Sequence, residues 1–214
     1  MAQAHPEKVD PSSPFSYKPD QTLLLILDYH TLFVDYISAH AAAEKATTLK
    51  AWARSQGVQV AHGLIEAADG VNPPPSMKGS KRTEQILSLL KADKKKWEEP
   101  LGLKPDLDNN ESNEVVFTRV PGYISALTSR KPMDINQWLA ERKYQSIILC
   151  GLSTSGCVLR TASQATDAGF VVTVVEDACQ DEPETHRIMV EKVLPSRVHV
   201  FDYKTFAEQW GAKE

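Results

Sequence analysis

Cys157 is the residue whose type and position best fit covalent chemistry. It follows an apolar run that begins at residue 147 and a segment of Gly, Ser and Thr, and it precedes a helical pattern of alanines. This order predicts a strand, a tight turn and a helix. Cys157 would lie at the start of that helix, where unpaired N–H groups and the helix dipole favour the thiolate. A lowered thiol pKa makes cysteine a nucleophile, and the same N–H groups can hold an oxyanion. The alternative is a small buried residue, as free cysteines usually are.

Asp28 is the second candidate, and it comes directly after the continuous apolar run of residues 22–27. Such a run is typical of a strand buried on both faces of a parallel sheet. Open α/β sheets place their chemistry at the carboxyl ends of these strands, which is where Asp28 would lie. The alternative is that this carboxylate only caps the following helix.

The turn around Cys157 resembles a family signature. Residues 150–158, with Arg160, Thr161, Ala162 and Ala165, are similar to the nucleophile segment of the isochorismatase-like cysteine hydrolases. That superfamily includes nicotinamidases, carbamoylsarcosine amidases and isochorismatases. Its first strand ends in a catalytic Asp, and residues 25–28 with Phe33 match that pattern, although His30 stands where many members carry Gln. The resemblance runs from about residue 22 to the C-terminus and implies an α/β hydrolase.

The sequence departs from the family at the catalytic lysine. In the family the third strand ends in this Lys, followed within a few residues by Tyr-Ser-Ala-Phe. Residues 124–127 are similar to that tail, but Arg119 occupies the nearest equivalent position. Arginine keeps the positive charge yet cannot transfer a proton. Lys131 is the next candidate, and since it lies past the motif we interpret it as a surface residue.

The resemblance implies a mechanism and a set of site residues. Asp28 would take the thiol proton, Cys157 would form a thioester while cleaving an amide or imide C–N bond, and Arg119 would supply charge and orientation. The turn at Leu152 and Ser153 would provide oxyanion donors, with backbone N–H groups at Ser153 and Cys157 and a cis peptide between Leu152 and Ser153. The expected pocket residues are Phe33, His62, Tyr123 and Thr154.

Two other functions stay open. One is isochorismatase-type cleavage of a vinyl ether with Asp28 as general acid, which needs no thiol nucleophile. The other is a catalytically weakened homologue that binds a ligand or a partner protein, since the family lysine is replaced by Arg119.

His62 is the residue that bears on metal binding. Nicotinamidases hold a metal in about this region through an Asp-x-His motif and a second His. Here no Asp stands two residues before His62 and no second His lies nearby. Because a zinc or iron site needs at least three well-placed ligands, we expect no metal and no other cofactor. We interpret His62 as a structural or pocket histidine.

Composition limits the possible partners and the compartment. The chain has 214 residues and a formal net charge of −4, with Lys and Arg spread along it, so we expect a small-molecule substrate and neither nucleic acid nor membrane. Residues 1–20 contain four prolines and no apolar h-region, which predicts an extended N-terminal arm and no signal peptide. Three widely spaced cysteines indicate a reducing, cytoplasmic compartment. We also expect a homo-oligomer, either a dimer or a tetramer.

Strands and helices alternate along the rest of the chain. The expected strands are residues 22–27, 58–62, 114–119, 146–150, 171–176 and 198–202, and the expected helices include residues 34–55, 82–90, 134–142, 184–193 and 204–210. This alternation predicts a three-layer, doubly wound α/β fold with a six-stranded parallel sheet flanked by helices, in one isochorismatase-like domain over residues 21–214. Residues 63–113 carry no chemical signal, but loops in such a position shape the pocket mouth.

Overall fold

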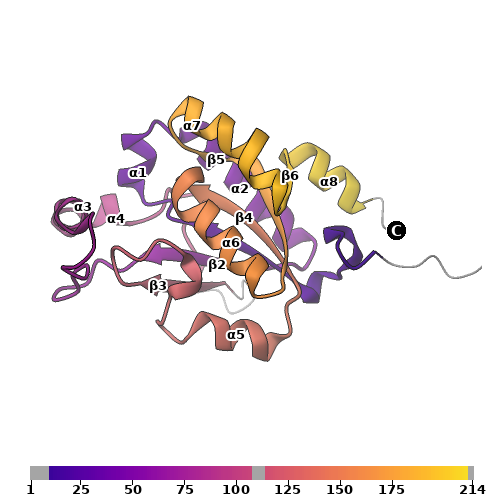
Figure 1. The fold of residues 1–214 in the computed structure, drawn as a ribbon, viewed down its shortest axis with the longest axis horizontal. Helices are drawn as coiled ribbons and strands as arrows, with labels where there is room; N and C mark the ends of the chain where they lie inside the picture. Colours follow the sequence, from indigo (N-terminus) through magenta and orange to yellow (C-terminus); the bar gives the residue numbers. More distant parts are fainter. Residues whose placement is uncertain (1–9, 108–113, 212–214) are drawn as a thin grey trace, which may run out of the picture.

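A six-stranded parallel sheet forms the centre of the molecule, as the sequence predicts. The computed structural model describes residues 10–107 and 114–211 (Figure 1). The strands lie in the order β3-β2-β1-β4-β5-β6, and each neighbouring pair is parallel. They are β1 (Thr22–Leu27), β2 (Gln59–Ile65), β3 (Val115–Arg119), β4 (Ser146–Leu152), β5 (Val171–Gln180) and β6 (His199–Phe201). This is the strand order of a doubly wound sheet.

Helices cover both faces of the sheet, which confirms the three-layer arrangement. They are α1 (Thr31–Tyr36), α2 (His40–Ser55), α3 (Ser80–Ala92), α4 (Lys94–Trp97), α5 (Ile135–Arg142), α6 (Leu159–Asp167), α7 (Pro183–Ile188) and α8 (Tyr203–Gly211). In Figure 1, α6 lies in front of the sheet and α2 behind it. Helix α8 packs on α2, where the ring of Trp52 lies 5.2 Å from that of Phe206.

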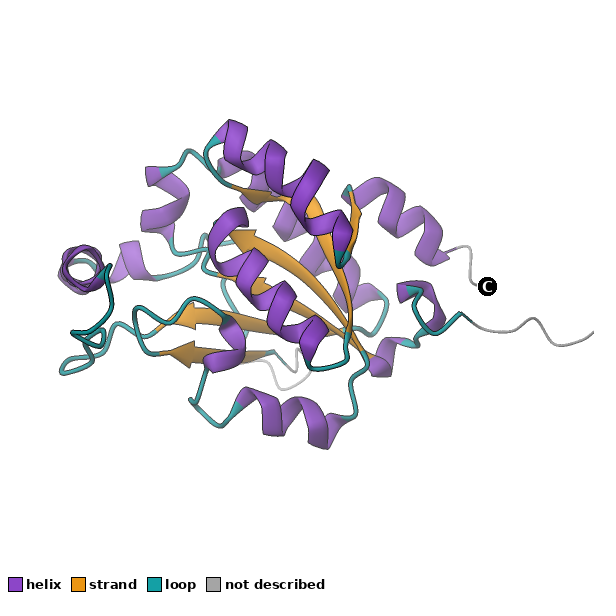
Figure 2. Cartoon of the chain, in the orientation of Figure 1, coloured by secondary structure: helices purple, strands orange, loops and turns teal. Residues whose placement is uncertain are grey.

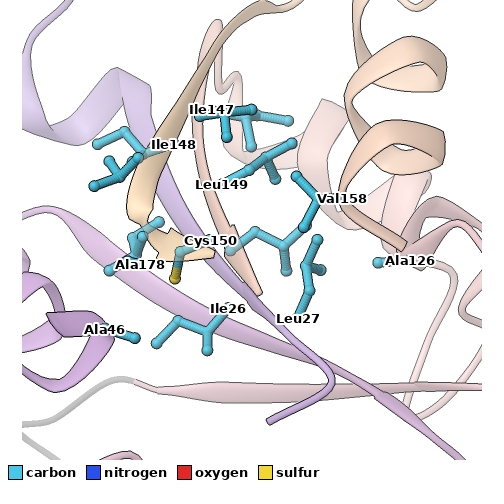
Figure 3. Packing of buried hydrophobic residues seen from close by; sticks show 14 of the residues in the cluster. Ile26, Leu27, Ala46, Ala126, Ile147, Ile148, Leu149, Cys150, Val158 and Ala178 are labelled. Carbon is cyan, nitrogen blue, oxygen red and sulfur yellow. The ribbon is translucent and has the colours of Figure 1, made fainter. Parts of the chain in front are cut away.

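The core is built on β1 and β4 because both strands are apolar on both faces. All six residues of β1 and all seven of β4 are buried. Successive side chains of a strand point to opposite faces. Figure 3 accordingly shows Ile26 near Ala46 of α2, on the same side as Cys150, while Leu27 lies on the other side with Val158. Long continuous apolar runs therefore place these two strands at the centre of the sheet.

The strand order creates one crevice for chemistry. From β1 the chain continues to β2 and β3 on one side of the sheet, whereas β4, β5 and β6 extend on the other side. Ligands of such sheets bind outside the carboxyl ends of the strands at this switch point. The arrowheads of β2 and β3 in Figure 2 point to the end of the sheet where α1, α3 and α4 lie. Asp28 after β1 and the turn after β4 meet at the same end.

Two expected elements differ from those in the structure. The helix expected over residues 34–55 is instead two helices, α1 and α2, because Ser38 adopts a φ of 55°, outside the helical region. The N-terminal arm expected to be extended forms two 3-10 turns, Pro14–Ser16 and Pro19–Gln21, within its described part. Phe15 there packs on Phe201 with ring centroids 5.6 Å apart, so burial of an aromatic ring holds this segment on the body. Residues 1–9 of the arm lie outside the described residues.

Residues 63–107, which carry no chemical signal in the sequence, build part of the molecule beside the carboxyl edge. Leu87 and Leu90 of α3 form a small apolar cluster that includes Phe33 and Trp97. This cluster fixes α3 and α4 next to α1 (Figure 1). No helix in residues 10–107 or 114–211 is long and apolar enough to cross a membrane.

Candidate active site

Asp28 is held rigidly at the end of β1. Its backbone N–H donates to the carbonyl of Gly63 at 3.1 Å, and its φ is 54°. This left-handed conformation costs an L-residue about 1–2 kcal/mol, although Asp tolerates it better than most residues. Strained backbone of this kind clusters at functional sites. The side chain of Asp28 is only 3% exposed and lines the pocket described below.

Arg119 reaches Asp28 across the intervening strand β2. Neighbouring strands lie about 4.8 Å apart, so β3 is roughly 10 Å from β1, a gap that a long side chain can span. The guanidinium forms a bidentate ion pair with the carboxylate, in which Nη1 lies 3.0 Å from Oδ1 and Nη2 contacts Oδ2. Nε donates to the carbonyl of Tyr123 at 2.9 Å. Burial disfavours the charged guanidinium, but Asp28 outweighs it and raises the pKa of Arg119, so this group is a permanent cation.

Cys157 lies beside this ion pair, in a π-helical turn, Thr154–Val158, that leads from β4 into α6. Its Sγ lies 3.5 Å from Nη2 of Arg119 and 3.9 Å from Oγ1 of Thr161. The Asp28 carboxylate lies close enough to raise the pKa of this thiol. Short π-helical segments are frequent at functional sites. The three residues expected to act together therefore form one cluster, in which Arg119 contacts both Asp28 and Cys157.

The protonation state of Cys157 corrects the sequence-based expectation. Position at a helix start predicts a thiolate, but the side chain is only 4% exposed. Burial raises the pKa of the thiol well above its ordinary value, and the nearby Arg119 cation lowers it only in part, while the negative charge of Asp28 adds to the rise. The resting residue is therefore a neutral thiol with a carboxylate acceptor next to it.

The turn after β4 depends on a glycine and on a carboxylate. A Cβ on Gly151, whose φ is 155°, would lie 2.5 Å from both Cβ and O of Leu27, so only glycine fits there. The Leu152–Ser153 peptide is cis, as the resemblance implies. Asp181 accepts hydrogen bonds from the N–H and Oγ of Ser155 at 2.8 and 2.7 Å. The Ser155 N–H is thus occupied and does not serve an oxyanion.

These groups face a pocket of about 830 Å³ at the carboxyl edge of the sheet. Of the residues expected at the site, the lining includes Asp28, Phe33, Arg119, Tyr123, Leu152, Ser153 and Cys157. The opposite wall comes from α1 and from residues 77–89, including the first three turns of α3. Pockets of this size take small-molecule ligands.

His62 does not line the pocket, which corrects one of the expectations. Strand β2 extends to Ile65, so His62 lies inside the strand and is fully buried. Its Nδ1 is 2.8 Å from Oε2 of Glu99 and its Nε2 is 3.5 Å from Oε2 of Glu114. Burial disfavours the charged imidazole, but the two carboxylates outweigh it and raise its pKa to about 9. His62 is therefore a structural cation in a buried ion network.

Metal binding finds no support around His62. In the part of the chain that the structure describes, no group of three or more His, Cys, Asp or Glu side chains could hold a metal ion. The second carboxylate of the network, Glu114, is also paired with the ammonium of Lys50 at 3.0 Å. These carboxylates neutralise protein cations, so the residues do not fit a metal site.

Thr154 and Lys131 also lie away from the reacting groups. Thr154 is buried, and its Oγ1 is 2.8 Å from Nδ1 of His186 rather than in the pocket wall. The side chain of Lys131 is 62% exposed and forms an ion pair with Glu66. Lys131 therefore does not replace the family lysine.

Sequence reasoning missed the far wall of the pocket and one carboxylate. Lys78, Arg82 and Ile86 line the pocket, but they come from a segment whose sequence shows only a weak helical pattern. Asp181 follows strand β5 in the way that Asp28 follows β1, so the rule that singled out Asp28 could have found it.

A doubly wound sheet with an Asp, a cation and a Cys at its switch point defines a class of α/β cysteine hydrolases. A sequence model described as the isochorismatase domain matches residues 22–203. The chain therefore belongs to the isochorismatase family of hydrolases.

Curated relatives match only short stretches of the chain. Isochorismatase domain-containing protein 2B of Mus musculus is 44% identical over 45 residues, which cover 21% of this chain and 21% of that protein. Isochorismatase domain-containing protein 2A of Mus musculus is 40% identical over 77 residues, which cover 36% of this chain and 32% of that protein. The match thus spans about a fifth to a third of the length of these relatives.

Solved structures are similar over nearly the whole chain. A cysteine hydrolase from Pseudomonas syringae pv. phaseolicola 1448A superposes with a TM-score of 0.74 at 18% identity, covering 92% of this chain and 96% of that one. The nicotinamidase PncA from Bacillus subtilis superposes with a TM-score of 0.63 at 20% identity, covering 85% of this chain and 99% of that one. These likenesses establish the fold.

Proposed function

We propose that the protein hydrolyses an amide or imide C–N bond of a small molecule, with Cys157 as nucleophile and Asp28 as general base. The observation that carries this proposal is a thiol that contacts Arg119, which in turn holds the Asp28 carboxylate beside it, at the wall of a large pocket. A thiol needs a nearby base to attack a carbonyl, and Asp28 is that base. The nicotinamidase likeness supports an amide substrate as well.

In the first half of the reaction the amide nitrogen leaves. Asp28 accepts the thiol proton as Sγ of Cys157 attacks the carbonyl carbon, and the carbonyl π electrons move to oxygen. Backbone N–H groups at Ser153 and Cys157 are the donors proposed for this oxyanion. When the tetrahedral intermediate collapses, the C–N bond breaks and Asp28 returns the proton to nitrogen. Ammonia or an amine departs, and a thioester remains on Cys157.

In the second half, water releases the acid. Asp28 accepts a proton from water as the water oxygen attacks the thioester carbon. The second tetrahedral intermediate then collapses, the C–S bond breaks, and the proton on Asp28 returns to the sulfur. The carboxylic acid product leaves, and both residues regain their resting states.

Arg119 acts in this scheme through charge and position alone. Its guanidinium holds both oxygens of Asp28 and lies 3.5 Å from Sγ, so it stabilises the thiolate as it forms. Because the resting thiol is protonated, proton transfer to Asp28 must precede or accompany the attack on the carbonyl. The arginine therefore replaces the charge of the family lysine without its proton chemistry.

The proposal is tested by assaying a panel of amides, imides and isochorismate with the parent protein and with Cys157→Ala. We expect turnover of at least one amide by the parent, with a thioester adduct seen by intact mass in rapid-quench samples, and none by Cys157→Ala. Cys179→Ala is the matched control, because this cysteine is buried in β5 outside the pocket. Turnover of isochorismate that survives Cys157→Ala would instead favour vinyl ether cleavage. Binding without turnover of any compound would favour a ligand-binding homologue.

The homo-oligomer and the cytoplasmic location expected from the sequence belong to the same proposal. Leu101 and Tyr36 are 92% and 76% exposed, and large apolar side chains of this kind are often buried where copies associate. Size-exclusion chromatography with light scattering should show a dimer or a tetramer, and a monomer at all concentrations would contradict the assembly.

A further inference from the structure

Two cations in the pocket wall, Lys78 and Arg82, form no ion pair within residues 10–107 and 114–211. Five charged residues line the pocket, namely Asp28, Lys78, Arg82, Arg119 and Asp181. Asp28 and Arg119 neutralise each other, and Asp181 is bound by Ser155. The charged residues that line the pocket therefore sum to +1, and Lys78 and Arg82 are its two cations outside the ion pairs of the described residues, although the whole chain has a formal net charge of −4.

The remainder of the wall is largely apolar. Phe33 of α1, Ile37 just after that helix, Ile65 of β2 and Ile86 of α3 contribute to it. Lys78 and Arg82 are exposed in the free protein, so a ligand whose apolar body covers this wall would displace water and strengthen their attraction for an anionic group. Arginine and lysine at such a place recognise a carboxylate by charge-assisted hydrogen bonds, and the guanidinium can do so with two parallel bonds.

We propose that Lys78 and Arg82 bind a carboxylate of the substrate while its amide lies against Cys157. The inference rests on the function proposed above and names the substrate class: an amide with an apolar body and a carboxylate remote from the bond that is cleaved. The cavity of about 830 Å³ has room for both ends of such a molecule. The acid of the substrate would thus contact α3 and the segment just before it, while the amide would contact the turn after β4.

Turnover by paired substrates tests the assignment. The probes are terephthalic acid monoamide and the monoamides of the linear dicarboxylic acids from succinic to suberic acid, each compared with its methyl ester. For the parent protein we expect the KM of the ester to exceed that of the free carboxylate by about tenfold or more, which is about 1.4 kcal/mol. In the double variant Lys78→Gln, Arg82→Gln this ratio should approach one, with the change in KM larger than that in kcat.

Lys81 offers a matched control. It is exposed and lies between the two cations in sequence, but it does not line the pocket. Lys81→Gln removes one positive charge beside Arg82 on α3 but none from the pocket wall, so it should keep the parent's ratio of ester to carboxylate KM. The assignment would be overturned if the double variant kept the parent's ratio of ester to carboxylate KM. It would also be overturned if Lys81→Gln lowered this ratio as much as the double variant does. Both cations are exposed, so the substitutions should leave the melting temperature near that of the parent.

Alkylation of Cys157 gives a readout that does not depend on hydrolysis. Terephthalic acid monoamide and its methyl ester are added separately before iodoacetamide, and the labelling of Cys157 is followed by peptide mass mapping. In the parent, the free carboxylate should protect Cys157 from alkylation at about tenfold lower concentration than the ester does. In the double variant, the two compounds should protect Cys157 at equal concentrations. If no amide is hydrolysed but this difference holds, the proposed reaction fails and the anion site stands. Equal protection by both compounds in the parent would overturn the anion site itself.

Discussion

Removal of the Arg119 charge is the perturbation that tests the electrostatics of the site most directly. Its Nη2 lies 3.5 Å from Sγ of Cys157. Two opposite unit charges at that distance attract by roughly 5 kcal/mol at an effective dielectric constant of about 20. Since one pKa unit is about 1.4 kcal/mol, Arg119 lowers the thiol pKa by at most about three units. Asp28 binds the same guanidinium and opposes this effect. If a third of the attraction survives, Arg119→Gln raises the pKa of Cys157 by about one unit.

The assay is the rate of alkylation of Cys157 by iodoacetamide at one pH near neutrality. A rise of one pKa unit cuts the thiolate fraction about tenfold but makes the thiolate a better nucleophile, with a Brønsted coefficient of about 0.45, so the net rate falls about fourfold. Cys157 of the Arg119→Gln protein should therefore be alkylated about fourfold to fiftyfold more slowly than in the parent. The lower figure corresponds to a rise of about one unit in the thiol pKa, and the higher figure to a rise of about three units. Arg119→Lys keeps the cation and should react within about twofold of the parent rate.

The folding of each variant must be measured as a control, because Arg119→Gln leaves the buried Asp28 without its partner. Breaking a buried pair in this way costs about 3–5 kcal/mol. The variant with both Arg119→Gln and Asp28→Asn removes both charges and should recover most of the melting temperature. Circular dichroism shows which variants are folded at the assay temperature. A folded Arg119→Gln protein that is alkylated as fast as the parent would refute the electrostatic role of Arg119.

Four further predictions concern the rest of the molecule. Iodoacetamide should label Cys157 ahead of the two other cysteines, because Cys157 lines the pocket whereas both others lie buried outside it; peptide mapping that finds either one labelled first would contradict the placement. The free energy of unfolding should fall by roughly 3 kcal/mol as pH rises from 6.5 to about 9, because folding raises the pKa of His62 from 6.5 to about 9. The stabilisation by the charged imidazole is complete below pH 6.5 and is lost as pH rises through about 9. Urea unfolding measures this fall, and a His62→Gln protein with the same pH dependence would exclude His62 as its source. Gly151→Ala should destabilise the fold by about 3 kcal/mol through its 2.5 Å clash with Leu27, whereas Gly57→Ala, with no atom within 4 Å of the new Cβ, should cost about 1 kcal/mol in thermal unfolding; equal costs would disprove the clash. Protein made without a His tag should contain no stoichiometric zinc or iron by elemental analysis, and one metal ion per chain would show that a ligand set was overlooked.

Local patterns in the sequence were enough to predict the sheet and the location of two candidate site residues. The apolar runs of β1 and β4 predict strands buried on both faces, and the residues that follow them, Asp28 and the turn before Cys157, must then lie at the carboxyl edge. These inferences need only side-chain periodicity and turn chemistry, which a short stretch of sequence contains. Errors occurred where one residue changes the local geometry, as when Ser38 separates α1 from α2.

Only the tertiary structure decided the properties that depend on contact between distant segments. Arg119 meets Asp28 because β2 places their strands two positions apart, and the sequence does not specify this distance. His62 is paired with Glu99, a partner 37 positions later in the numbering, rather than with a pocket ligand. The thiol of Cys157 is neutral because burial removes water from it, and desolvation depends on how all the surrounding elements pack. The sequence by itself thus determined which strand ends carry chemical groups, whereas packing determined which of those groups meet and in which protonation state.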